Sequence, residues 1–416
     1  MKAILKNASI YKNGKIEKRD MLLNGIELFP FSPNSITEDT VTIENCIIFP
    51  GFCDVHVHLR EPGFSYKETM ETGTASAARG GYTAVFAMPN LSPAPDCLEN
   101  LEKELSAIKR GAAIDVYPYG TITKGQKGEE LAKLEEMKDA AVAFSDDGRG
   151  VQTDALMEEA MKKAVKLGKV IVAHCEDNSL LNGGYIHDGE YAKLHGHRGI
   201  PSASEYKQIE RDIELVRKTG VKYHVCHVSA KESIEAIRKA KAEGLDITCE
   251  TAPHYLTLDD SVLEEDGRFK MNPPLRSKED REALVKGVLD GTVDMIATDH
   301  APHSAEEKSK GLEKSLMGVV GLETAFPVLY TYLVKTGKVP MEIIGQLLVD
   351  KPRERFGITK DPGFTVFKLD ECYKVDPDEF LSMGRATPYK DTVVYGKCLT
   401  TVHGGKVVYI DKNLMR

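Results

Sequence analysis

Between residue 47 and the region after Gly321, short apolar runs alternate with amphipathic stretches whose apolar positions recur every three to four residues. The first pattern predicts buried strands and the second predicts helices. The predicted strands are 47–58, 82–88, 114–119, 141–144, 170–173, 223–226, 247–250 and 295–297. The predicted helices are 67–79, 97–110, 129–138, 154–167, 204–219, 230–243, 277–289 and one after Gly321. Such a series favours a TIM-type (β/α)8 barrel over an open sheet, since no glycine-rich fingerprint follows the first strand.

At both ends of the chain the apolar residues alternate with polar ones at a period of two. Asn13-Gly14 and Asn24-Gly25 interrupt the N-terminal alternation, and Asn-Gly is a strong hairpin signal. Because isolated hairpins are marginal in water, we expect the two ends to pack together as a small β-sandwich module. The predicted organisation is an N-terminal part of this module at 1–49, the barrel at 50–362 and the C-terminal part at 363–416.

Composition and charge exclude some partners. The 416-residue chain has a net charge of −9 and no Lys/Arg cluster interleaved with aromatic residues, which argues against nucleic acid and anionic membranes. No apolar run approaches the roughly 18 residues of a spanning helix. The eight cysteines lack paired CxxC spacing, and three of them sit in apolar strand-like tracts. This usage indicates buried thiols in a reducing cytoplasm.

Polar residues at the carboxyl ends of barrel strands are the candidates for chemistry. His56 and His58 are two residues apart in a strand, so both imidazoles point to one face. His174, His227 and Asp299 follow later strands. Together with a carboxylate after the fourth strand, these groups suit a pair of zinc-like ions.

Several polar residues have more than one interpretation. Asp146 and Asp147 both follow the fourth strand, and their spacing does not choose between them. His224 lies on the opposite strand face from His227, which indicates a structural role, whereas His254 fits either reading. The charged segment 304–311 is interpreted as a solvated loop or as a lid.

Four segments carry a family resemblance. They are Asp54–Gly63 (DVHVHLREPG), Ala297–His303 (ATDHAPH) with Lys308 five residues on, Lys270–Arg276 (KMNPPLR) and Gly321–Ala325 (GLETA). Together they resemble the dihydroorotase family of the amidohydrolase superfamily, and the likeness runs nearly end to end. It implies zinc-dependent, reversible cyclisation of N-carbamoyl-L-aspartate to L-dihydroorotate in pyrimidine biosynthesis.

The resemblance also implies roles for single residues. His56 and His58 would bind one zinc with Asp299 as a further ligand, and His174 and His227 would bind the second. No lysine stands where many relatives have a carboxylated bridging lysine, and Asp147 matches the subgroup in which an aspartate bridges. The substrate-binding positions that match are His58, Arg60, Asn90, Asn272, His303, Met317 and Gly318. The subgroup usually has Phe in place of Met317 and two histidines in place of His254-Tyr255.

The expected chemistry follows from these groups. A hydroxide shared by two zincs is a strong nucleophile at neutral pH, and Asp299 can take its proton and return it to the leaving nitrogen. Arg60 offers a forked donor for a carboxylate, which a hydantoin does not need. An allantoinase or hydantoinase is the alternative, and a non-catalytic barrel subunit is a third reading. The sequence leaves open whether the chain forms a homodimer and whether it associates with an aspartate transcarbamoylase.

Overall fold

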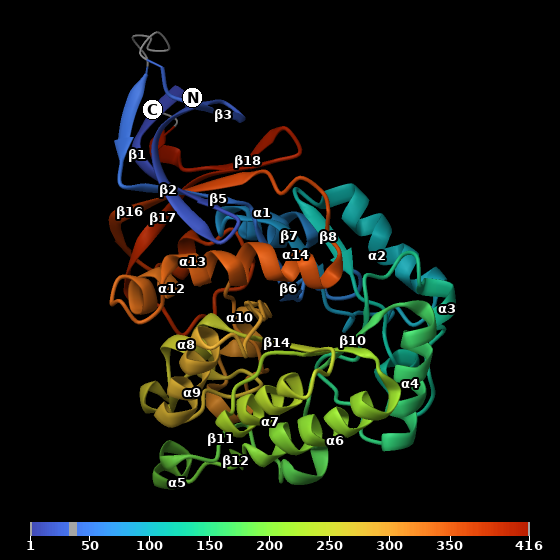
Figure 1. Cartoon of the computed structure of the whole chain (residues 1–416). Coiled ribbons are helices and arrows are strands. Elements are labelled where there is room, and N and C mark those ends of the chain that lie inside the picture. The colour runs from blue at the N-terminus through green and yellow to red at the C-terminus, as the bar shows by residue number, and fades with distance from the viewer. Residues whose placement is uncertain (1, 33–39, 415–416) are drawn as a thin grey trace.

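The structure, a computed structural model, describes residues 2–32 and 40–414. Each of the predicted barrel strands has a counterpart in it (Figure 1). The barrel strands are β6 (Phe52–Val57), β7 (Tyr82–Ala87), β8 (Asp115–Pro118), β9 (Phe144–Ser145), β10 (Val170–Ala173), β13 (Lys222–Val225), β14 (Ile247–Thr251) and β15 (Met295–Ile296).

Parallel pairing closes these strands into a barrel. Strands β6, β7 and β8 are neighbours in one sheet, and β9, β10, β13, β14 and β15 are neighbours in another. Two parallel bridges join the sheets, Gly120 with Phe144 and Val57 with His300. The predicted (β/α)8 barrel is therefore confirmed.

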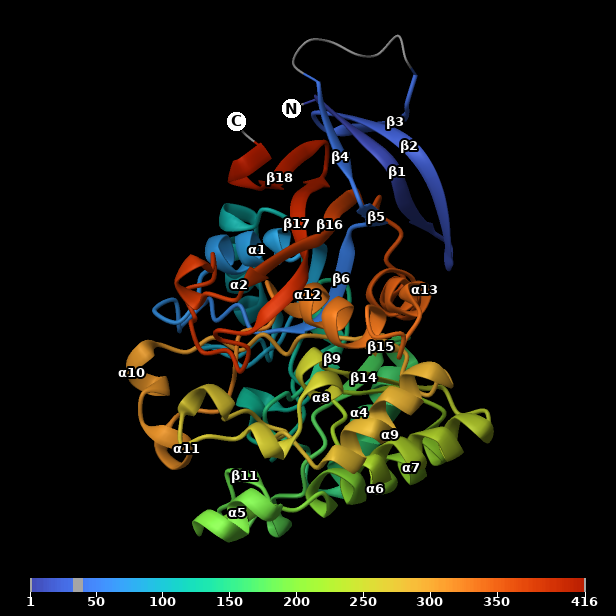
Figure 2. The same ribbon diagram turned by 90° about the vertical axis from the view of Figure 1, so that its left-hand side faces the viewer.

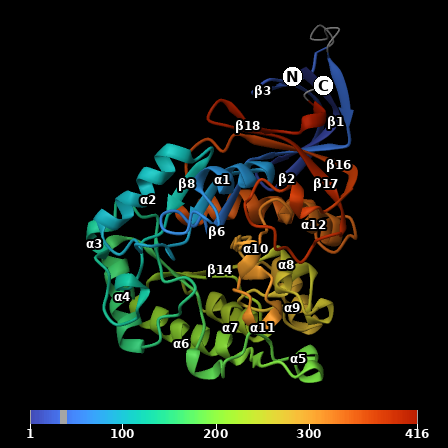
Figure 3. The same cartoon turned by 180° about the vertical axis from the view of Figure 1, so that it is seen from behind.

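Helices cover the outside of the barrel and follow one another around it (Figures 1 and 3). They are α1 (Met70–Arg79), α2 (Leu98–Gly111), α3 (Leu134–Met137), α4 (Asp154–Leu167), α6 (Ala203–Thr219), α7 (Lys231–Ala242), α9 (Lys278–Leu289) and α12 (Ala325–Leu329). In α4 the residues Met157, Ala160 and Ala164 form a buried stripe, and Gly168, with φ 66°, ends the helix. The shorter helices are α5 (Glu190–His195), α8 (Pro253–Thr257), α10 (Ala305–Lys308), α11 (Gly311–Lys314), α13 (Met341–Gly345) and α14 (Lys351–Phe356).

The helix predicted at 129–138 is wrong over its first half, because only Leu134–Met137 is helical. The residues before it pair backward with the loop after β8. The N–H of Lys124 donates to the carbonyl of Glu130 at 2.9 Å, and Thr123 forms an antiparallel bridge with Leu131. A helix there would lose these bonds.

Both chain ends build one further sheet (Figure 2). Its strands are β1 (Lys2–Lys12), β2 (Lys15–Asn24), β3 (Glu27–Pro30), β4 (Val41–Glu44), β5 (Cys46–Pro50), β16 (Phe364–Lys374), β17 (Val393–His403) and β18 (Lys406–Ile410). Antiparallel pairing of β16 with β5 joins the C-terminal strands to the N-terminal ones. Leu5, Ile48, Val366 and Leu399 belong to a small core of this sheet, so the predicted packing of the two ends is confirmed.

The strand predicted at 47–58 is two strands that separate at Gly51. A Cβ on Gly51 would lie 2.2 Å from the Thr83 side chain and 2.6 Å from the carbonyl of Pro362, so only glycine fits. Strand β5 belongs to the terminal sheet and β6 to the barrel. The terminal sheet is thereby fixed directly to the first barrel strand.

Two further features concern disulfide bonds and membrane-spanning helices. All eight cysteines lie among the described residues and are free thiols. Among the helices formed by residues 2–32 and 40–414, none is long and apolar enough to cross a membrane.

Candidate active site at the carboxyl ends of the barrel strands

Histidine and aspartate side chains from different barrel strands meet at one end of the barrel. His56 belongs to β6, and Asp147, His174, His227 and Asp299 follow β9, β10, β13 and β15; all are buried. His227 and Asp299 have positive φ values of 33° and 48°. Such backbone strain in non-glycine residues is typical of functional sites.

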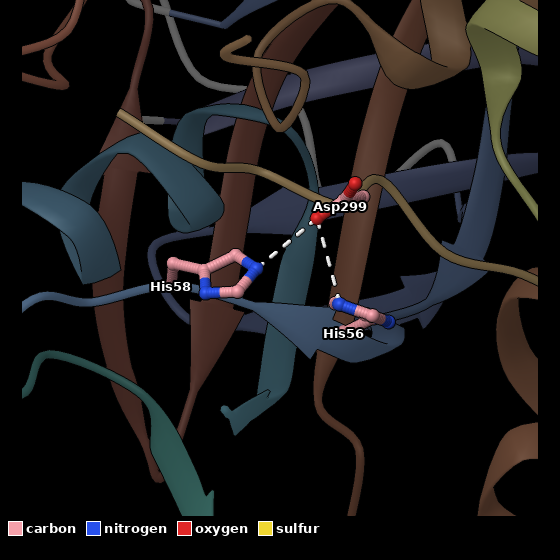
Figure 4. Close-up of side chains that lie close together, drawn as sticks. All are labelled: His56, His58 and Asp299. Atoms are coloured by element: carbon pink, nitrogen blue, oxygen red, sulfur yellow. Dashed lines mark hydrogen bonds and ion pairs between the residues drawn. The ribbon is translucent and has the colours of Figure 1, made fainter. Parts of the chain in front are cut away.

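One group of side chains surrounds Asp299. Its Oδ1 lies 3.1 Å from Nε2 of His58 and 3.5 Å from Nε2 of His56, and the two rings face the carboxylate from the same side (Figure 4). The ring centroids of the two histidines are 5.4 Å apart. The strand spacing therefore places both imidazoles where one ion could contact them together with a carboxylate.

Asp147 lies among all four imidazoles. Its Oδ1 is 3.3 Å from His56 Nε2, 3.5 Å from His227 Nε2 and 3.6 Å from His174 Nδ1, and its Oδ2 is 3.4 Å from His58 Nε2. This central position is the one that a bridging carboxylate requires.

The neighbouring Asp146 points away from this group. Its Oδ1 accepts hydrogen bonds from the backbone N–H groups of Ile122 at 2.8 Å and Thr123 at 3.0 Å, and its Oδ2 accepts one from the Thr123 hydroxyl. The structure thus brings Asp147, and not Asp146, to the histidines.

The donor set fits a metal centre. Nε2 of His56, Oδ1 of Asp147, Nε2 of His174 and Nδ1 of His227 are buried and have no hydrogen-bond partner among the described residues. Burial lowers the pKa of His56, but Asp147, Glu250 and Asp299 outweigh it and raise that pKa well above its usual value. A field that favours a proton on a buried imidazole also favours a metal cation, and imidazole with carboxylate is a typical zinc donor set.

Sequence reasoning missed Glu250, which orients His56. Its Oε1 accepts a hydrogen bond from Nδ1 of His56 at 2.6 Å, which turns Nε2 toward the carboxylates. Its Oε2 lies 3.0 Å from Nε2 of His224, and Nδ1 of His224 lies 2.8 Å from the Thr248 hydroxyl. Metal-binding histidines commonly have such a second partner. The available signal was a carboxylate inside the apolar strand 247–251.

A cavity of about 460 Å³ opens over the cluster, a size that suits a small-molecule ligand. Except for His56, every residue predicted for the site lines it. These residues are His58, Arg60, Asn90, Asp147, His174, His227, Asn272, Asp299, His303, Met317 and Gly318. Residues from widely separated parts of the sequence thus reach one cavity.

Arg60 and His303 form one wall of this cavity. Nε of Arg60 donates to the carbonyl of Pro302 at 3.2 Å, and a terminal guanidinium nitrogen lies 3.4 Å from Nε2 of His303. Burial lowers the pKa of Arg60 to about 10, so it remains a cation at neutral pH. Burial, with the positive charges of Arg60 and Lys67, lowers the pKa of His303 to about 3 and keeps that ring neutral.

Neighbouring groups fix the remaining polar residues. Lys67 Nζ lies 3.2 Å from Nδ1 of His303, and Nε2 lies 2.8 Å from the carbonyl of Met317. With Lys67 as donor to Nδ1, the proton of the neutral ring is on Nε2. Asn90 Oδ1 accepts a hydrogen bond from Nδ1 of His58 at 2.8 Å, and Asn272 Nδ2 donates to Glu176 at 2.9 Å.

His254, for which the sequence allows two readings, is buried, and its Nε2 has no hydrogen-bond partner among the described residues.

Comparisons with known proteins agree on the kind of protein. The family model described as Dihydro-orotase-like matches residues 45–233. A dihydroorotase of Fusobacterium nucleatum is 48% identical over 98% of this chain and 99% of its own, and one of Bacillus cereus is 46% identical over 96% of each. Two solved structures share the fold. The L-hydantoinase of Arthrobacter aurescens has a TM-score of 0.83 at 24% identity, covering 98% of this chain and 96% of its own. The D-hydantoinase of a Thermus species has a TM-score of 0.82 at 23% identity, covering 98% and 95%. The chain belongs to the dihydroorotase family.

Proposed function

We propose that this dihydroorotase interconverts N-carbamoyl-L-aspartate and L-dihydroorotate in pyrimidine biosynthesis, using two zinc ions bound at the barrel mouth. The observation that carries the proposal is the shared cavity. Apart from His56, the histidine–aspartate cluster lines the same space of about 460 Å³ as the buried cation Arg60. An amide-hydrolysing centre and a carboxylate-binding group thus face one small ligand.

The proposed metal ligands follow the geometry of the cluster. His56, His58 and Asp299 would hold one ion, and His174 and His227 would hold the other. Asp147 is the proposed bridge, because its two oxygens lie 3.3–3.6 Å from nitrogens of all four rings. When bound, the ions supply Lewis-acid activation of water and of the amide carbonyl.

Asp299 is the proposed proton carrier. Burial raises the pKa of its carboxyl, but His56 and His58 outweigh burial and lower it below its usual value. The group is therefore ionised at neutral pH and can accept the proton of the attacking water. In ring opening Asp299 passes that proton to the ring nitrogen that leaves. In ring closure it takes the proton from the same nitrogen, which forms the C–N bond, and gives it to the hydroxide that leaves as water.

The rest of the cavity wall is the proposed binding surface. Arg60 would hold the substrate carboxylate through its terminal nitrogens, since its Nε is already bonded to Pro302. Asn90, Asn272 and His303 would contact the polar edge of the ring, together with the backbone of Met317 and Gly318. A neutral His303 presents no charge that would compete with Arg60 for the carboxylate.

One experiment tests these proposals together. The purified protein is assayed for ring closure of N-carbamoyl-L-aspartate and, in parallel, for ring opening of dihydroorotate, allantoin and an uncharged hydantoin, with zinc measured by elemental analysis. We expect turnover of the two carboxylate-bearing compounds and up to two zinc ions per chain. Equal turnover of the uncharged ring would favour a hydantoinase. No turnover with full zinc occupancy would favour a non-catalytic subunit.

A cytoplasmic location is also proposed, because all the cysteines are free.

A further inference from the structure

Lys308 is a buried lysine that the chemistry proposed above does not use. It stands at the end of α10 and is 7% exposed. Its Nζ donates to the backbone carbonyls of Lys270 at 2.9 Å, Leu316 at 2.8 Å and Gly318 at 2.7 Å. Burial lowers the pKa of Lys308 to about 7. The protonated side chain has three hydrogens, and each has an acceptor. No carboxylate of residues 2–32 or 40–414 forms an ion pair with it. All three of these hydrogen bonds therefore go to backbone carbonyls.

The three carbonyls come from two segments that form walls of the candidate active site. Lys270 lies two residues before Asn272, which lines the cavity. Leu316 and Gly318 flank Met317, and these three residues also line it. The N–H of Gly318 donates to the carbonyl of Lys270 at 3.0 Å, which is a second link between the same segments. Lys308 itself does not line the cavity. It can therefore affect a ligand only through the segments that it holds.

The backbone at Gly318 lies close against Ala301. Gly318 has φ 136°, and a Cβ there would lie 2.6 Å from the carbonyl oxygen of Ala301. The carbonyl of Met317 lies 2.8 Å from Nε2 of His303, so a shift of this backbone would also move His303. Without Lys308, the carbonyls of Leu316 and Gly318 lose their donor, whereas that of Lys270 keeps the N–H of Gly318. The carbonyl of Gly318 is buried, and an unsatisfied buried acceptor is costly, so this backbone would turn toward water.

We propose that Lys308 is a positioning residue, which fixes the backbone of residues 316–318 against residue 270 so that Met317, Gly318 and Asn272 meet the substrate in one geometry. The proposal rests on the proposed function for its kinetic consequence and on the three hydrogen bonds for its structural one. It also gives the charged segment 304–311 a role as an anchor, since α10 carries Lys308 into the protein.

Lys308→Met tests the proposal, because methionine is unbranched and has no donor. We expect KM for N-carbamoyl-L-aspartate to rise about tenfold or more with kcat within about threefold of native, since ground-state and transition-state contacts are weakened together. Zinc content should not change, because no metal-ligand candidate contacts Lys308. Amide exchange of the zinc-loaded enzyme, followed by mass spectrometry, should accelerate in the peptide that contains 316–318.

Two further variants keep the test decisive. Lys310→Met, an exposed lysine of the same segment that pairs with Glu306 at 3.4 Å, should leave KM and exchange unchanged. If Lys308→Met does not fold, Lys308→Arg retains the charge but offers a planar fork, and the same rise in KM is expected. An unchanged KM, or unchanged exchange at 316–318, overturns the proposal. If the native protein turns over neither substrate, the proposed function fails, whereas the exchange rates still decide the role of Lys308.

Discussion

Single carboxylate and amide oxygens decide which nitrogen of His56 and of His58 faces the cluster. Glu250 bonds Nδ1 of His56 at 2.6 Å, and Asn90 bonds Nδ1 of His58 at 2.8 Å, so both rings turn Nε2 inward. The alternation of residues along a strand is enough to predict that His56 and His58 share a face. The carboxylate in the apolar strand 247–251 is visible in the sequence, but its partner His56 lies on another strand, so the local pattern does not reveal the contact.

The choice between Asp146 and Asp147 has a direct test at the residue scale. Asp147→Ala removes the carboxylate that faces four imidazoles, so we expect zinc content to fall to one ion or fewer and activity to be lost. Asp146→Ala removes the carboxylate that accepts hydrogen bonds from two backbone N–H groups, so the free energy of unfolding should fall by about 1–3 kcal/mol. Elemental analysis and urea unfolding of both variants distinguish the roles. Zinc loss in the Asp146 variant alone would reverse the assignment.

Arg60→Lys tests how the substrate carboxylate is held. A lysine keeps the charge but cannot reproduce a two-pronged donor, so kcat/KM for dihydroorotate should fall roughly 30- to 150-fold, equivalent to about 2–3 kcal/mol. The matched control is Arg110→Lys, a largely exposed arginine that pairs with Glu61 at 2.7 Å, which should have native kinetics. An unaltered kcat/KM in Arg60→Lys would show that the carboxylate binds elsewhere.

Asp299→Asn separates proton transfer from metal binding. The amide keeps an oxygen toward the ions but cannot accept a proton, so both zinc ions should remain while kcat falls by roughly 10²–10⁴-fold. Steady-state rates are measured beside zinc content on the same preparation. Near-native rates with both ions bound would exclude Asp299 as the proton carrier.

At the scale of elements, periodicity predicts well where one face of an element decides its structure. The predicted helix 154–167 and strand 170–173 coincide with α4 and β10. The errors occur where distant backbone intervenes. Thr83 approaches Gly51 and separates β5 from β6, and the loop after β8 pairs with residues that were expected to begin a helix at 129. Such contacts depend on chain segments that are far apart in sequence, so a local pattern cannot show them.

Helix α2 contains a buried carboxyl group, and we expect its burial to lower the stability of the folded chain at neutral pH. Glu104 is fully buried, neither of its carboxylate oxygens has a hydrogen-bond partner among the described residues, and burial raises its pKa well above the usual value. Below pH of about 4.5 the group is neutral in both the folded and unfolded states. As pH rises, the unfolded chain ionises while the folded one stays neutral, so the folded state loses stability relative to a variant without this carboxyl.

We therefore expect Glu104→Met to be more stable than the native protein at pH 7 by about 1–3 kcal/mol, with a smaller difference at pH 5. Urea unfolding at the two pH values measures this. Glu102→Met, an exposed position on the same helix, is the control and should change stability little at either pH. A difference that grows as pH falls would contradict the burial argument.

At the scale of the whole molecule, one apolar core connects the barrel with the terminal sheet. Phe49 of β5 packs on Phe326 at a centroid distance of 5.6 Å, and Phe52 of β6 stacks on Phe367 of β16 at 5.5 Å. These rings lie in the same buried cluster as residues from the barrel helices. The candidate metal site lies at the strand ends and adds little to this core, so we expect folding and metal binding to be separable.

Chelation tests that separation. Removing the metal should abolish activity and leave the far-UV circular dichroism spectrum at 25 °C nearly unchanged, because the barrel closes through its own backbone pairing. The thermal midpoint should nevertheless fall, since ions that bind only the folded chain stabilise it by mass action. Adding zinc back should restore both activity and midpoint, whereas magnesium should not, because it prefers oxygen ligands and this cluster offers mainly imidazole. Loss of the far-UV signal together with activity would instead mean that the metal holds the fold.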